Sequence, residues 1–154
     1  MTGSDQIIDR FMMQIMNDST LNTLYNTSGS SVFVIFQEAW LLAAIDDFAR
    51  VSTEDLTYID SVGSTIGYFT ADLTSRAINI LARCMVKQWL QQQVSNKLAF
   101  DRYFKDREFS MSAPMLPSMR GYLIEVIEGV DKLLGDYSWD KNDWSGWFNQ
   151  NFSS

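Results

Sequence analysis

Residues 118–137, SMRGYLIEVIEGVDKLLGDY, form the most regular pattern in the chain. Apolar side chains recur there at intervals of three and one, as they do along one face of an α-helix. They are Met119, Tyr122, Leu123, Val126, Ile127, Val130, Leu133, Leu134 and Tyr137. At 1.5 Å per residue such a helix is about 30 Å long. One face must therefore pack along a whole domain, which predicts an α-helical fold with one long C-terminal helix.

The sequence before this stretch predicts further helices. Helical spacing of apolar residues covers 4–17, whereas 18–31 is rich in Ser, Thr, Asn and Gly and is predicted to be a loop. The next helix, ending near Val51, is apolar on nearly every side. We expect it to be the central helix of the bundle, because a helix without a polar face is usually buried.

Between residues 52 and 72 the helical period is lost. Two β-branched or aromatic patches around glycines predict either a short β-hairpin or an ordered loop at 57–70. A third helix over 72–94, a shorter one over 96–104 and a loop over 109–117 containing both prolines complete the pattern. The predicted fold class is all-α: a small bundle of four to five helices.

Length and composition limit the function. A chain of 154 residues fits one domain, which we place at 1–137, followed by a C-terminal arm at 138–154. The chain has no histidine and one cysteine, Cys84, which excludes a Ser-His-Asp or Cys-His nucleophile and a histidine-ligated zinc within it. Cys84 lies mid-helix among apolar residues and is predicted to be buried packing. We therefore expect neither an enzyme nor a cofactor.

Two pairs of adjacent acids offer a metal-dependent alternative. They are Asp46, Asp47, Glu54 and Asp55, and carboxylates bind divalent cations or serve as acid and base. Neighbouring residues on a helix point about 100° apart, so neither pair alone makes a site. Capping and solvation of helix ends is the favoured interpretation, and no metal is predicted.

Charge is divided along the chain. The formal net charge is -7, which argues against sequence-independent binding of duplex DNA. Residues 1–60 carry nine acids and two bases, 76–107 carry seven bases and two acids, and 108–154 carry seven acids and three bases. The simplest interpretation is a helix with a basic solvated face. The alternative is that basic and acidic faces of neighbouring copies meet in a head-to-tail ring. Candidate inter-subunit residues are Asp46, Asp47, Arg83, Lys87, Arg102, Lys105 and Arg107.

Aromatic side chains concentrate at the C-terminus. Fully exposing several of them would forfeit about 1.5 to 3 kcal/mol of burial each. Either the tail folds back on its own domain or it inserts its aromatics into pockets of a partner or neighbouring subunit, which we favour. A membrane-interface role for the tail ranks third, since the tail has few cations to bind anionic lipids. The most apolar run of the chain, at 32–45, is too short to span a bilayer. The candidate partner-binding residues are Tyr137, Trp139, Trp144, Trp147, Phe148 and Phe152.

About two thirds of the chain resembles the helical head-to-tail connector (adaptor, or neck) proteins of tailed bacteriophages. The resemblance is carried by EAWLLAAI (38–45), DLT (72–74), ILARCMVKQWL (80–90), DREFSMS (106–112) and LLGDYS (133–138). These are packing motifs rather than catalytic signatures. The chain departs from the family pattern in its Trp-rich tail and in the glycine-containing stretch near Gly63, so partner contacts there are the least transferable.

The resemblance implies a structural virion protein without enzymatic activity. Members form an oligomeric ring, commonly of twelve copies, that binds the portal protein, extends the DNA channel and attaches other neck or tail proteins. DNA passes without sequence-specific binding, and no membrane is involved. The implied location is the virion neck, with the host cytoplasm during assembly. The rival hypothesis is a soluble acidic binding protein, of the immunity or nucleic-acid-mimic type, that inhibits a target and has no catalytic activity.

Overall fold

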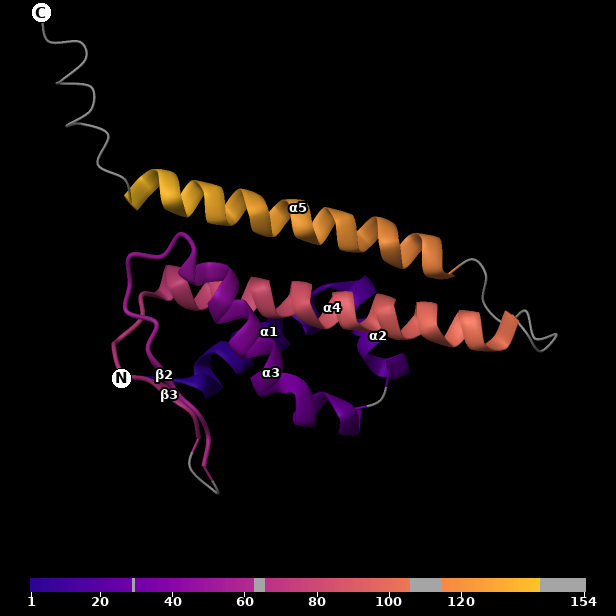
Figure 1. Ribbon diagram of the computed structural model, residues 1–154, viewed down its shortest axis with the longest axis horizontal. Helices are drawn as coiled ribbons and strands as arrows, with labels where there is room; N and C mark the ends of the chain where they lie inside the picture. Colours follow the sequence, from indigo (N-terminus) through magenta and orange to yellow (C-terminus); the bar gives the residue numbers. More distant parts are fainter. Residues whose placement is uncertain (29, 63–65, 106–114, 142–154) are drawn as a thin grey trace, which may run out of the picture.

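The computed structural model describes residues 1–28, 30–62, 66–105 and 115–141 (Figure 1). Its helices are α1 (Ser4–Asn17), α2 (Ser19–Ser28), α3 (Ser30–Ala49), α4 (Ser75–Lys105) and α5 (Met115–Lys141). Its strands are β1 (Thr2–Gly3), β2 (Tyr58–Ile59) and β3 (Tyr68–Phe69). The prediction of a small helical bundle with a long C-terminal helix is confirmed, and the choice left open at 57–70 is resolved as a hairpin.

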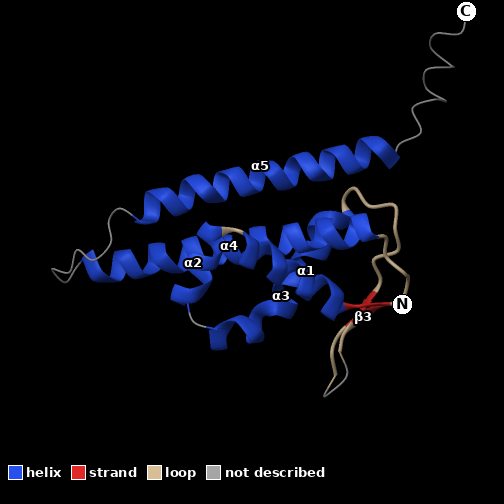
Figure 2. Cartoon of the chain, turned by 180° about the vertical axis from the view of Figure 1, so that it is seen from behind, coloured by secondary structure: helices blue, strands red, loops and turns tan. Residues whose placement is uncertain are grey.

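Helix α4 is the centre of the bundle. It contacts α1, α3 and α5, and α5 runs along it on the side away from α1 and α3 (Figures 1 and 2). The expectation that α3 would be central is wrong. Although α3 is apolar and packs on α4, it buries residues such as Leu41 and Phe48 and leaves Phe36 and Leu42 exposed. A uniformly apolar helix can still have one face in contact with solvent.

Helix α4 is continuous where two helices were predicted. No glycine or proline lies between Ser75 and Lys105, and the Ser95-Asn96 pair is only mildly unfavourable in a helix. Helix α4 has buried side chains on several of its sides: Ala77, Ile80, Leu81, Ala82, Cys84, Met85, Val86, Trp89, Leu90 and Val94. It can therefore pack against α1 and α3 on one side and against α5 on the other.

The loop predicted over 18–31 is also wrong, because helix α2 occupies most of it. Asp18 lies just before α2, and its Oδ1 accepts hydrogen bonds from the backbone N–H groups of Thr20 (2.9 Å) and Leu21 (3.0 Å). An Asp in this position caps a helix by satisfying its first free donors. The polar composition concealed a capped helix whose Leu21 and Leu24 are buried.

The hairpin belongs to a three-stranded antiparallel sheet of order β1-β3-β2. Tyr58 pairs with Phe69 across the hairpin, and the N-terminal strand, which was not predicted, pairs Thr2 with the same Phe69. Glu38 of α3 fixes this sheet to the bundle, accepting hydrogen bonds from the Tyr58 hydroxyl (3.1 Å) and from the backbone (2.9 Å) and hydroxyl (2.6 Å) of Ser61.

Both ends of α5 extend beyond the predicted 118–137. Pro117 lies in its first turn, where a residue without a backbone N–H is well tolerated. At the other end α5 continues to Lys141, so the first four residues assigned to the arm are helical. The remaining arm, 142–154, lies outside the described residues. Over the part that the structure describes, no helix is both long enough and apolar enough to cross a membrane.

Candidate partner-binding site

Tyr137, the first predicted partner contact, is a core residue. Its side chain is 0% exposed, and its ring packs edge-on against Phe48 of α3 with centroids 4.9 Å apart at 71°. The hydroxyl donates a hydrogen bond to Glu54 Oε1 at 3.2 Å. Tyr137 lies on the same face of α5 as Val126 and Val130, which are also buried. Its contacts are made within the chain, and it offers no surface to a partner.

Trp139 has the opposite environment, with 63% of its side chain exposed. It lies two residues further along α5, which turns it toward the outer face of the helix. The neighbouring charges hold the end of α5 in place: Arg76 of α4 forms an ion pair with Asp140 at 2.7 Å. Arg76 and Lys141 also approach the Tyr137 ring, at 5.3 and 5.5 Å from its centroid. The other four predicted aromatics, Trp144, Trp147, Phe148 and Phe152, lie outside the described residues.

Two of the predicted inter-subunit charges pair with each other inside the chain. Lys87 of α4 forms an ion pair with Asp47 of α3, and their side chains are only 11% and 16% exposed. Gln88 donates a further hydrogen bond to Asp47 at 2.9 Å. Since removing one member of a largely buried pair leaves an uncompensated charge, Lys87 and Asp47 are joined for the bundle itself rather than offered to a neighbour.

The other predicted charges have mixed placements. Asp46 and Arg83 are exposed, on α3 and α4 respectively. Arg102 and Lys105 belong to the last turns of α4, and their side chains, like the whole of Arg107, lie outside the described residues. Among the predicted inter-subunit charges whose side chains the structure describes, Asp46 and Arg83 therefore lie at the surface.

The acidic pair Glu54 and Asp55 accepts hydrogen bonds from neighbouring threonines. Glu54 accepts hydrogen bonds from Thr74 at the start of α4, through Oε2 from its backbone N–H (3.0 Å) and through Oε1 from its hydroxyl (2.7 Å). Burial raises the pKa of Glu54, but these bonds, the Tyr137 hydroxyl and the charge of Lys141 outweigh it and lower the pKa. Asp55 accepts from the Thr57 hydroxyl and backbone, which lowers its pKa. Within the described ranges no three His, Cys, Asp or Glu residues come together as a metal site.

Cys84 is buried in α4, as predicted. Burial raises the pKa of its thiol to about 12, and the nearby Lys87 ammonium offsets only part of that rise. A thiol with so high a pKa is almost entirely protonated near neutral pH and is a poor nucleophile.

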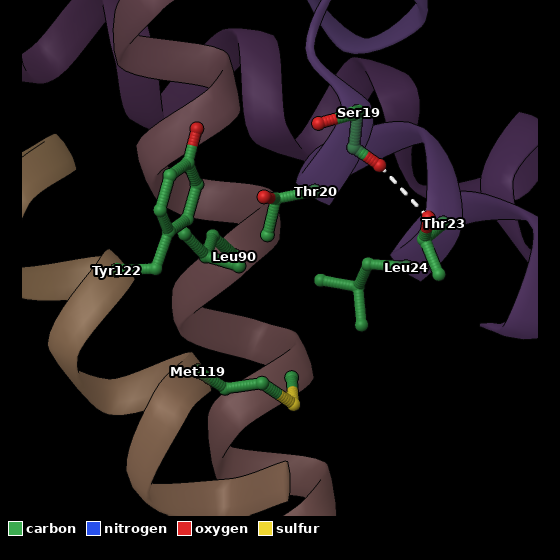
Figure 3. Close-up of a pocket in the computed structure, with 7 residues that line it drawn as sticks. All are labelled: Ser19, Thr20, Thr23, Leu24, Leu90, Met119 and Tyr122. Atoms are coloured by element: carbon green, nitrogen blue, oxygen red, sulfur yellow. Dashed lines mark hydrogen bonds between the residues drawn. The ribbon is translucent and has the colours of Figure 1, made fainter.

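A pocket that the sequence did not predict lies where α2, α4 and α5 meet (Figure 3). Its volume is about 370 Å³, and its lining combines aliphatic side chains with hydroxyl groups. Leu90 comes from α4, Met119 and Tyr122 come from α5, and the rest comes from α2. The α2 residues are Ser19, Thr20, Thr23 and Leu24. An apolar cavity with a few hydroxyls at its edge is a common form of ligand or side-chain site.

Tyr122, which lines the pocket, is bonded to Asp18, the residue directly before α2. The Tyr122 hydroxyl donates to Asp18 Oδ2 at 2.5 Å, while Oδ1 of the same carboxylate caps α2. Burial raises the pKa of Asp18, but the Tyr122 bond, the two backbone bonds and the charge of Arg83 together lower the pKa. Burial, and then the Asp18 carboxylate, raise the pKa of Tyr122. One ionised side chain thus joins α2 to α5.

The loop predicted over 18–31 hid this site, because α2 supplies four of its lining residues. The order Asp18, Ser19, Thr20, Leu21 was a usable signal, since an Asp directly before a stretch with Leu21 and Leu24 three apart is a helix start. The hydrogen bond between Tyr122 and Asp18 joins residues 104 positions apart. No pattern of neighbouring residues in the sequence could have predicted it.

Comparison with known proteins found no relative of this chain. No protein-family model matches the chain, and no curated protein or solved structure matches it either.

Proposed function

We propose that this chain is a structural subunit of a phage neck, in which copies form a ring on the portal, continue the DNA channel and present a platform for the next neck or tail protein. The motifs that resemble those of connector proteins are its first support. Three of them, at 38–45, 80–90 and 133–138, lie in α3, α4 and α5, which pack together in the bundle.

The observation that carries the proposal is the outer face of α5. This helix packs lengthwise on α4 (Figure 1). The charged residues on its solvent side are mainly acidic. The exposed acids of α5 are Glu125, Glu128, Asp131, Asp136 and Asp140, against the exposed cations Arg120, Lys132 and Lys141. A wall of this charge repels phosphates, which is what a channel that must pass DNA without retaining it requires.

Exposed apolar side chains on α3 support self-association. Phe36 is 37% and Leu42 is 41% exposed, and Phe36 stacks on Trp40 with ring centroids 6.2 Å apart. Trp40 is buried and donates its indole N–H to Gln92 of α4 at 2.6 Å. Phe36 is thus carried on a rigid base, as interface aromatics commonly are.

The decisive experiment mixes the full-length protein with rings of its portal protein and images the mixture by negative stain. We expect an added layer of density with the rotational symmetry of the portal and a central opening. A mixture in which portal rings remain bare and this chain sediments alone at saturating concentration contradicts the proposal.

A charge-reversal pair tests the channel face. With Glu125→Lys and Glu128→Lys on the outer face of α5, we expect assembled portal rings to retain duplex DNA at salt concentrations where the parent complex releases it. The matched control reverses Asp5 and Asp9, two exposed acids of α1, and should leave DNA release unchanged. Equal retention by both variants would mean that the outer face of α5 does not line the channel.

The same acidic face would also suit a nucleic-acid mimic that inhibits a DNA- or RNA-binding protein. Such a protein stays monomeric and binds its target one to one. Formation of a ring on the portal separates the two hypotheses, since a mimic gives none.

A further inference from the structure

We propose that the pocket between α2, α4 and α5 receives an indole, from Trp144 or Trp147, that belongs to the arm of a second copy of this chain. The inference rests on the proposed function, since it states how neighbouring subunits of the ring hold each other. It concerns a contact between two copies alone, so it can be tested without the portal.

The lining of the pocket suits an indole. Leu24, Leu90 and Met119 offer an apolar surface, and the hydroxyls of Thr20 and Tyr122 lie at its edge (Figure 3). A tryptophan side chain needs both, because it is mostly apolar yet carries one N–H that seeks an acceptor when buried. At about 370 Å³ the cavity has room for a bicyclic ring.

The chain itself supplies the aromatic side chains. The 13 residues at 142–154 contain Trp144, Trp147, Phe148 and Phe152. Tryptophan is the residue most enriched among those that dominate binding at protein interfaces. Asp143, beside Trp144, has the opposite charge to Arg83. Arg83 is an exposed cation whose charge acts on both Asp18 and Tyr122 at the edge of the pocket.

Covalent geometry argues that these tryptophans occupy another copy. Tyr122 precedes Lys141 by 19 residues of helix, a distance of about 28 Å. Trp144 follows Lys141 by three residues and Trp147 by six, so their Cα atoms reach at most about 11 and 22 Å from Lys141 in any conformation. Even with a fully straight chain running back along α5, and roughly 6 Å more for the side chain, the Trp144 indole stays well short of Tyr122. The Trp147 indole comes level with Tyr122 at most, with no chain length left to turn into the pocket. The pocket of a neighbouring copy carries no such limit.

Cross-linking in the full-length chain tests the contact directly. One variant carries Thr23→Cys at the pocket and a second carries Ser145→Cys between the two tryptophans. The native Cys84 is buried, and its thiol pKa is raised to about 12, so it will not compete for a maleimide reagent. After the two proteins are mixed and treated with a short bis-maleimide, we expect a dimer whose linked peptides contain positions 23 and 145.

Two controls make the result specific. Asp9→Cys on the exposed side of α1 replaces Thr23→Cys and should give only background dimer. Adding Trp144→Ala and Trp147→Ala to the Ser145→Cys chain should lower the yield of dimer by about tenfold or more, as loss of anchor residues does. Circular dichroism of each variant verifies that the bundle is intact.

Three outcomes overturn the inference: a mixture with no dimer above the Asp9→Cys background, a yield that does not depend on the tryptophans, or a cross-link within a single molecule when one chain carries both Thr23→Cys and Ser145→Cys. Phe152, whose reach is about 40 Å, would be the occupant in that last case. Dimers without a ring on the portal would contradict the proposed function and leave this inference standing. Rings without the cross-link would do the reverse.

Discussion

Replacing Tyr137 by alanine tests whether the C-terminal end of α5 belongs to the core or to a partner surface. The side chain is 0% exposed and contacts Phe48, Glu54 and the cations that flank its ring. Truncating a buried aromatic to alanine costs about 3 to 5 kcal/mol. The edge-on contact with Phe48 and the hydroxyl bond are included in that range, and the bond alone contributes about 1 kcal/mol.

For a chain of this size each kcal/mol shifts Tm by about 2 to 4 °C. We therefore expect Tyr137→Ala to lower Tm by roughly 8 to 16 °C, using about 4 kcal/mol, and Tyr137→Phe to lower it by only about 2 to 4 °C. Thermal and urea unfolding followed by far-ultraviolet circular dichroism measure both.

Trp139→Ala is the matched control, since it removes a larger aromatic from the exposed side of the same helix end. Its expected cost is about 0.5 kcal/mol. The reasoning is refuted if Tyr137→Ala leaves Tm within a degree or two of the parent, or if Trp139→Ala costs as much. A consequence follows for truncation: deleting 142–154 should preserve the bundle, whereas deleting 137–154 should destabilise it by at least as much as Tyr137→Ala.

Three further perturbations test other parts of the structure. Because the folded pKa of Asp18 is lowered, the contribution of Asp18 to folding stability is present above the unfolded pKa near 3.9 and is lost as pH falls through the folded value. Asp18→Asn, which keeps a helix cap, should lower the free energy of unfolding by about 1 kcal/mol at pH 7. It should also flatten the acid side of the plot of stability against pH, with stability measured by urea unfolding. Gly67→Ala should cost about 1 to 3 kcal/mol in the same urea titration, since the added Cβ would overlap the Tyr58 hydroxyl and lie 3.1 Å from the Ile59 carbonyl oxygen; an unchanged midpoint would show that the hairpin adapts freely. Cys84 should resist a thiol reagent at pH 8 in the folded protein and react fully in denaturant, and rapid labelling of the folded chain would contradict its burial.

Local patterns in the sequence were sufficient for the elements that depend on local spacing. The three-and-one recurrence over 118–137 predicted α5, and two apolar patches around glycines limited 57–70 to a hairpin or a loop. The apolar neighbours of Cys84 predicted its burial. These predictions hold because the period of a helix or strand is set by backbone geometry within a few residues.

Helix boundaries were harder to predict from the sequence. The Ser/Thr/Asn-rich composition of 18–31 concealed α2, whose start depends on the Asp18 side chain rather than on average polarity. The predicted break after Val94 is absent because Ser95 and Asn96 weaken a helix without ending it. In both places a small local preference was outweighed by a cap or by the packing of neighbouring turns.

The sequence by itself determined that this is a helical, acidic chain without histidine and with three of its five tryptophans near the C-terminus. Only the tertiary structure decided that α4 is central, that Tyr137 faces inward, that Lys87 and Asp47 join each other, and that Tyr122 meets Asp18 beside a pocket. Each of these depends on which faces of distant helices pack together. Helical spacing specifies that a face is apolar, but the partner of that face is chosen by the packing of the whole bundle.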